Sequence, residues 1–127
     1  MRHLLTVTAL AEAATGLALL VLPSMVASIL LGGSLDFPAA LVMARLGGAA
    51  LLCIGAACWR VRDDPNSRAA RGLLAALLLY NVAVAAVLVH AAAGLSLSGI
   101  GLWPAVAFHV AMTAWCIACL RTGRAAI

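Results

Sequence analysis

The sequence predicts an all-α integral membrane protein: an antiparallel four-transmembrane-helix bundle with both termini cytoplasmic. Composition is the first reason, because 66% of the 127 residues are hydrophobic, 9% are charged, and the mean hydropathy is +1.16. Soluble domains carry about 25% charged residues, and a soluble fold of this size cannot bury so much apolar surface. The second reason is the placement of the arginines described below. We expect one domain over residues 1–127.

Four apolar segments reach the roughly 20 residues that a helix needs to cross about 30 Å of hydrocarbon. They cover residues 4–22, 38–59, 72–93 and 102–120. Helices are expected because a spanning segment must satisfy its own backbone hydrogen bonds. Pro23 ends or bends the first helix, and the apolar run SMVASILLG after it is either a kinked continuation or a short interfacial piece.

The arginines predict the orientation of the four spans. Seven of the eight Lys and Arg residues lie before the first segment, between the second and third, or after the fourth. The other two connections carry Asp36 and no basic residue. Cytoplasmic loops are enriched in Lys and Arg, so we expect both termini in the cytoplasm of a bacterial-type inner membrane. These seven residues are Arg2, Arg60, Arg62, Arg68, Arg71, Arg121 and Arg124.

Two charges fall inside predicted spans, where an unpaired charge costs several kcal/mol. Glu12 lies about 12 Å from the cytoplasmic boundary and Arg45 about 10 Å from the opposite one, at 1.5 Å per residue. In a core of about 30 Å, the two backbones differ in depth by about 8 Å, which both side chains together can bridge. The sequence therefore predicts an ion pair between Glu12 and Arg45.

Further polar residues fall at similar depths. They are Asn81, His109 and, nearer the outer end, His90. With Glu12 and Arg45 they form a predicted intramembrane polar cluster. One interpretation is structural, since interhelical polar contacts hold bundles together. The other is a substrate or proton site. His90 and His109 also allow a less favoured hypothesis, a haem with two axial histidines.

Four cysteines lie in the second and fourth segments. Cys116 and Cys119 are three residues apart and share a helix face, which makes them weak candidates for a soft-metal site. Packing is the favoured interpretation, because free cysteine behaves as a small apolar residue.

The connection RVRDDPNSRAAR is the most basic stretch. Two interpretations are open: it contacts anionic lipid headgroups at the cytoplasmic face, or it serves only to set the topology of the spans. Nothing in it indicates nucleic-acid binding. Its basic side chains are Arg60, Arg62, Arg68 and Arg71.

The stretch LAEAATG, residues 10–16, resembles the first helix of small multidrug resistance transporters. Those proteins also have four helices, a similar length and a membrane-embedded glutamate, which Glu12 matches. The resemblance covers only this stretch. The chain departs from that pattern in its longer basic connection, in lacking a lysine near the end of the first helix and a W-S-G-like stretch in the third, and in having Arg45 and His109. No family is assigned.

No nucleophile–base motif, phosphate-binding loop or dinucleotide fingerprint occurs in the sequence, so we expect no enzyme. The favoured interpretation is a small inner-membrane accessory subunit or membrane-embedded binding protein. The alternatives are an oligomeric proton-coupled transporter that uses Glu12 and, less favoured, a haem-binding electron carrier. The expected partners are the lipid bilayer and either further copies of the chain or a larger membrane complex.

Overall fold

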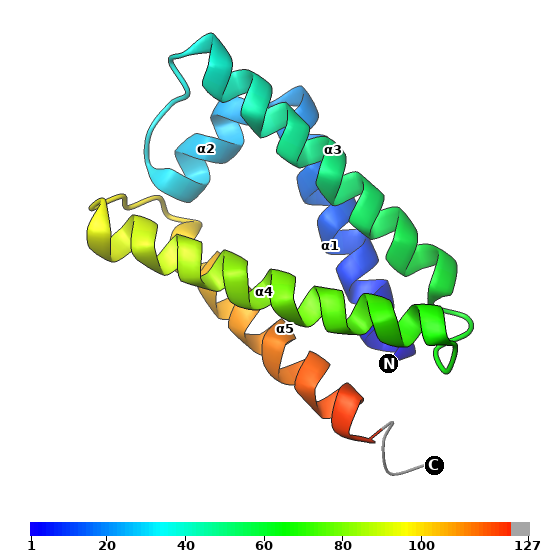
Figure 1. Cartoon of the computed structure of the whole chain (residues 1–127). Coiled ribbons are helices and arrows are strands. Elements are labelled where there is room, and N and C mark those ends of the chain that lie inside the picture. The colour runs from blue at the N-terminus through cyan, green and yellow to red at the C-terminus, as the bar shows by residue number, and fades with distance from the viewer. Residues whose placement is uncertain (123–127) are drawn as a thin grey trace.

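The computed structural model describes residues 1–122, and over this range the chain is helical with no strands (Figure 1). Four of its helices are long and apolar enough to cross a membrane, which identifies a multi-pass membrane protein. The fifth, α2, is a short helix of nine residues. The helices are α1 (Arg2–Val21), α2 (Pro23–Leu31), α3 (Pro38–Val61), α4 (Arg68–Gly94) and α5 (Leu102–Thr122).

The apolar run after Pro23 forms a separate helix rather than a continuation of α1. Leu22 leaves helical geometry with φ −129° and ψ 52°, and Pro23 occupies the first position of α2, where its missing N–H breaks no helical bond. Gly32 ends α2 in the left-handed region at φ 80°, a conformation that glycine adopts without strain. The chain therefore turns twice before α3 begins.

The long helices begin and end close to the predicted boundaries, with one extension. α4 begins at Arg68 rather than at residue 72, because Ser67 provides its N-cap: the Ser67 hydroxyl accepts a hydrogen bond of 3.1 Å from the Ala70 amide.

Helices α1 and α3 pack side by side along most of their length (Figure 1). Glycines permit the contact. A Cβ atom added to Gly16 would lie 2.6 Å from the Gly48 carbonyl oxygen, and one added to Gly48 would lie 2.7 Å from the Gly16 oxygen. Small residues allow helix backbones to approach in this way in lipid. The close approach packs α1 and α3 against each other as one pair.

Helices α4 and α5 form the second extensive pair, and the two pairs contact each other far less than the helices within each pair do. At one end a buried apolar cluster joins all four long helices, with Leu4 and Leu5 packed in the same cluster as Leu74 and Cys116. At the other end, a smaller cluster around Leu102 joins α4 and α5 to α2.

The start of α1 and the end of α5 lie in the same cluster, because Leu4 of α1 shares it with Cys116, Cys119 and Leu120 of α5. Arg124, which contributed to the predicted orientation, lies outside the described residues.

Candidate functional site

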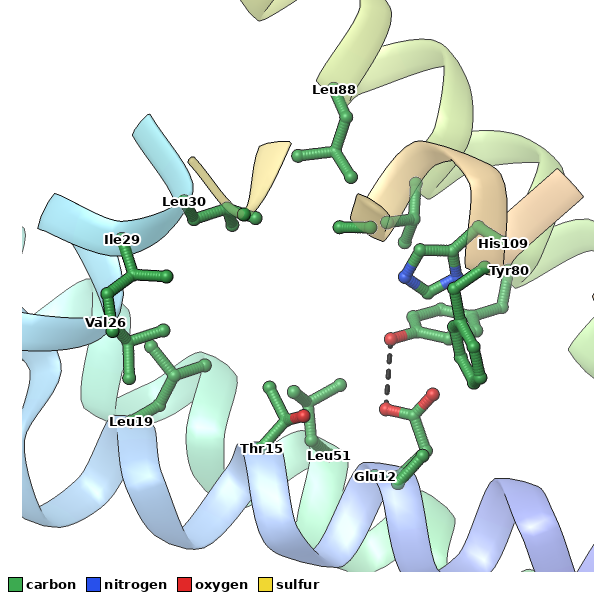
Figure 2. Close-up of a pocket in the computed structure, with 15 residues that line it drawn as sticks. Glu12, Thr15, Leu19, Val26, Ile29, Leu30, Leu51, Tyr80, Leu88 and His109 are labelled. Carbon is green, nitrogen blue, oxygen red and sulfur yellow. Dashed lines mark hydrogen bonds between the residues drawn. The ribbon is translucent and has the colours of Figure 1, made fainter. Parts of the chain in front are cut away.

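A cavity of about 370 Å³ lies between the two helix pairs, in the region that neither end cluster fills (Figure 2). Every described helix contributes to its wall. Most of the lining is aliphatic, including three residues of α2, Val26, Ile29 and Leu30. A volume of this size is in the range of pockets for small ligands.

Glu12 of α1 is the acidic residue of this wall. It is 5% exposed, and its Oε2 atom accepts a hydrogen bond of 3.0 Å from the Tyr80 hydroxyl of α4 (Figure 2). This bond crosses from the first helix pair to the second. Within residues 1–122 no ion pair includes Glu12, so its carboxylate meets a neutral donor and a cavity.

His109 of α5 lines the same cavity and is held by Asn81. The Asn81 Nδ2 atom donates to the Leu77 carbonyl at 2.7 Å, which makes its Oδ1 atom the one that faces His109 Nδ1 at 2.8 Å. Because an amide oxygen only accepts, His109 must carry its proton on Nδ1. In a neutral imidazole this leaves Nε2 as an acceptor.

Aromatic rings surround His109 on two sides. The Tyr80 ring meets it edge-to-face with centroids 5.7 Å apart, and the Phe108 ring does so at 5.4 Å. All three rings line the cavity. The polar side chains of the wall are thus the Glu12 carboxylate, the Tyr80 phenol, the His109 imidazole and the Thr15 hydroxyl.

The predicted ion pair between Glu12 and Arg45 does not form. Arg45 is exposed, and its Nε atom donates to the carbonyl oxygen of Leu20 at 3.3 Å. Leu20 lies in the last turn of α1, where carbonyl groups lose their helical partners. The depth estimate placed the two residues at similar levels in the membrane, but it could not show on which face of α3 Arg45 lies.

His90 also lies away from the cavity. It is exposed on α4, beside Gly94. Nine residues of helix, or roughly 13 Å along its axis, separate it from Asn81, the residue that binds His109. The structure therefore does not bring His90 and His109 together as two axial ligands of one haem.

Cys116 is part of the buried cluster at the end of the molecule, and Cys119 packs against that cluster. Both are free thiols. Among the described residues, no group of three or more His, Cys, Asp or Glu side chains is arranged to hold a metal ion.

The basic connection is partly neutralised. Asp63 accepts from Arg62 at 3.4 Å and from Arg2 at 3.2 Å. The Arg62 guanidinium also stacks over the Trp59 ring at 3.2 Å from its centroid. Of the four arginines predicted to contact lipid, Arg62 therefore has partners within the protein, and Arg60 and Arg68 are exposed.

Sequence reasoning did not nominate Tyr80, Thr15 or Phe108, which all line the cavity. Tyr80 carried a usable signal, because it is the single tyrosine of the chain and lies within an apolar segment. A phenol in such a position usually finds a hydrogen-bond partner. Comparison of the chain with protein-family models, with curated proteins and with solved structures gave no match.

Proposed function

We propose that this protein is a membrane-embedded binding protein for a small amphipathic amine, whose protonated head group binds at Glu12. The observation that carries the proposal is a buried carboxylate, with no cation beside it, that opens onto a cavity between two helix pairs.

The charge of the ligand is inferred from Glu12. A charged side chain inside a membrane requires a partner or a polar cavity. The partner that the sequence suggested, Arg45, donates elsewhere, and no Lys or Arg is among the described residues that line the cavity. A cationic ligand would supply the missing positive charge.

The chemistry of the head group is inferred from the other polar atoms. Tyr80 already donates to Glu12, and His109 with its proton on Nδ1 offers an acceptor at Nε2. Glu12 and His109 therefore offer acceptors to a ligand, and the Thr15 hydroxyl can accept as well, which favours a ligand with N–H donors. A protonated amine has both the donors and the charge, and the Tyr80 and Phe108 rings can add cation–π attraction.

The apolar body of the ligand is inferred from the rest of the wall. Leu19, Val26, Leu30, Leu51 and Leu88 face the cavity (Figure 2). These side chains suit an alkyl or aryl group of modest size.

The test uses octylamine, octanol and octanoate, which share a chain and differ in the head group. We expect octylamine to raise the thermal stability of the purified protein. A ligand at ten times its Kd adds about 1.4 kcal/mol, which corresponds to a Tm shift of about 5 °C. Octanol and octanoate should produce little or no shift.

Glu12→Gln should abolish the octylamine effect while the protein remains folded, because glutamine keeps an acceptor for Tyr80 and removes the charge. Asp36→Asn is the matched control, since Asp36 is an exposed carboxylate bonded to Ser34 outside the cavity. An equal response to amine and alcohol, or an undiminished response in Glu12→Gln, would refute amine binding at this site.

The same proposal includes the inner membrane and an antiparallel bundle with both termini cytoplasmic. It is supported by the arginine distribution and by the shared cluster of Leu4 and Cys116, which places the start of α1 near the end of α5. Single cysteines at His3 and Thr122 in an otherwise cysteine-free protein test it. Reaction of either one with an impermeant maleimide in intact cells would contradict it.

A second candidate function is proton-coupled transport of the same amines. It is favoured by one observation: the cavity lies between two separately packed helix pairs, bridged near its middle by Glu12 and Tyr80. Under an imposed pH gradient, proteoliposomes that contain the intact protein should accumulate more octylamine than protein-free vesicles do. Proteoliposomes that contain the Glu12→Gln protein should not show this additional uptake. Binding without any such excess would restrict the protein to the binding role.

A further inference from the structure

A second hollow lies on the outer face of the α1–α3 pair, away from the cavity. It is a groove of about 610 Å³. Ala9 and Ala13 of α1 and Gly55 and Ala56 of α3 form its small-residue part, and Leu10 and Leu52 add larger apolar walls. This surface faces what would be the acyl-chain region of a membrane.

The groove has one charged end. Trp59 and Arg60, near the end of α3, complete its lining. Arg60 is exposed, and its side chain makes no hydrogen bond or ion pair with the described residues, whereas the neighbouring Arg62 is held by Asp63 and Trp59. Tryptophan is enriched where hydrocarbon meets headgroups, so Trp59 indicates the depth of this end. The groove is therefore apolar along most of its length and cationic at the interface.

We propose that this groove binds one anionic phospholipid, with an acyl chain along the small residues of α1 and α3 and the phosphate at Arg60. The groove has an apolar stretch, then Trp59 at the interface, then the positive charge of Arg60. An anionic lipid has an acyl chain, then an interfacial region, then a negatively charged phosphate, in the same order. Anionic lipids are attracted to arginines at the cytoplasmic face, which is the face proposed for this end of α3.

A second copy of the chain fits the groove less well than a lipid does. Two copies related by a twofold axis along the membrane normal would present the same face to each other. The Arg60 side chains would then approach at the same depth, and like charges repel. An anionic lipid in the groove would instead bring a negative charge to Arg60, and opposite charges attract.

Native mass spectrometry of the detergent-purified protein tests the proposal by titration with phosphatidylglycerol and with phosphatidylcholine of the same acyl chains. We expect one phosphatidylglycerol to be retained in preference to phosphatidylcholine. Arg60→Gln should weaken that retention about fivefold, the effect of one arginine near an anionic headgroup. Ala56→Phe, which fills the groove, should remove retention of both lipids.

Arg68→Gln is the matched control, because Arg68 is an exposed arginine of the same connection that does not line the groove. It should leave retention nearly unchanged. Equal weakening by Arg60→Gln and Arg68→Gln would show attraction to the whole basic face rather than a site. Equal retention of the two lipids would overturn the role of Arg60, and a dimer that Ala56→Phe converts to a monomer would assign the groove to a second copy.

Discussion

The contact within the α1–α3 pair and the contact between the two helix pairs are built from different chemistry. Inside the pair, glycine backbones approach so closely that Gly16 and Gly48 leave no room for a Cβ atom. Between the pairs, an apolar cluster joins one end, α2 packs against α4 and α5 at the other, and the middle holds a cavity crossed by the hydrogen bond of Tyr80 to Glu12. The α1–α3 contact depends on glycines that have no side chain, whereas the middle of the contact between the pairs depends on polar side chains that line a cavity. Stability and binding should therefore respond to different substitutions.

The largest expected effect is on the α1–α3 contact. Gly48→Val places a branched side chain against the backbone of α1, and overpacking of this kind costs about 3 kcal/mol. Thermal unfolding in detergent measures it. Gly47→Val is the control, because a Cβ atom at Gly47 meets nothing within 4 Å. Equal losses from both substitutions would mean that helix propensity, not the close approach, limits stability.

The next effect concerns the bond between the pairs. Tyr80→Phe removes the donor to Glu12 and leaves a buried carboxylate without a hydrogen bond, at a cost of about 2 kcal/mol. The same substitution in a Glu12→Gln background should cost less, since the remaining group is neutral. Unfolding free energies of the four proteins give the coupling energy. No coupling would show that Tyr80 contributes through packing alone.

A smaller effect of opposite sign is expected at Thr8. Thr8 is 2% exposed, and its hydroxyl has no hydrogen-bond partner among residues 1–122. Thr8→Val keeps the shape and removes the unsatisfied group, so it should stabilise the protein by about 1 kcal/mol. At Thr6 the hydroxyl donates to the Arg2 carbonyl at 3.0 Å, and Thr6→Val should bring no such gain. Destabilisation by Thr8→Val would indicate that a water or ligand satisfies this hydroxyl.

The smallest expected value is the coupling between Glu12 and Arg45. Because Arg45 donates to Leu20, Glu12→Gln and Arg45→Gln should be additive within about 0.5 kcal/mol. The same double-mutant cycle in detergent measures it. A coupling of several times this size would restore the ion pair that the sequence suggested.

The long helices were predictable from the sequence because lipid imposes a simple rule: a segment must be apolar, long and hydrogen-bonded within itself. The break at Pro23 was also predictable, but whether α2 continued α1 or turned away was not. That choice depends on the packing of α2 against α5, including a hydrogen bond of 2.8 Å from the Gly101 amide to the Ile29 carbonyl, and these residues are far apart in sequence.

The candidate site was predictable only in part. The depth of a residue in the membrane follows from its position along the helix, whereas the direction in which its side chain points depends on how the helices pack. Glu12, Asn81 and His109 were nominated by depth, and the structure places them in or beside the cavity. Arg45 and His90 met the same depth argument but are exposed and do not line the cavity. The helices of this chain are apolar on most faces, so amphipathic periodicity could not separate these cases.

The hydrogen bonds of Asn81 give this protein a built-in spectroscopic reporter. Since the amide fixes the proton of His109 on Nδ1, the Nε2 atom is the ring nitrogen left to sense the cavity. The two other histidines, His3 and His90, are exposed. In protein labelled with nitrogen-15 at histidine, occupation of the cavity should therefore move the Nε2 resonance of His109 more than its Nδ1 resonance, which would report occupancy from a native side chain.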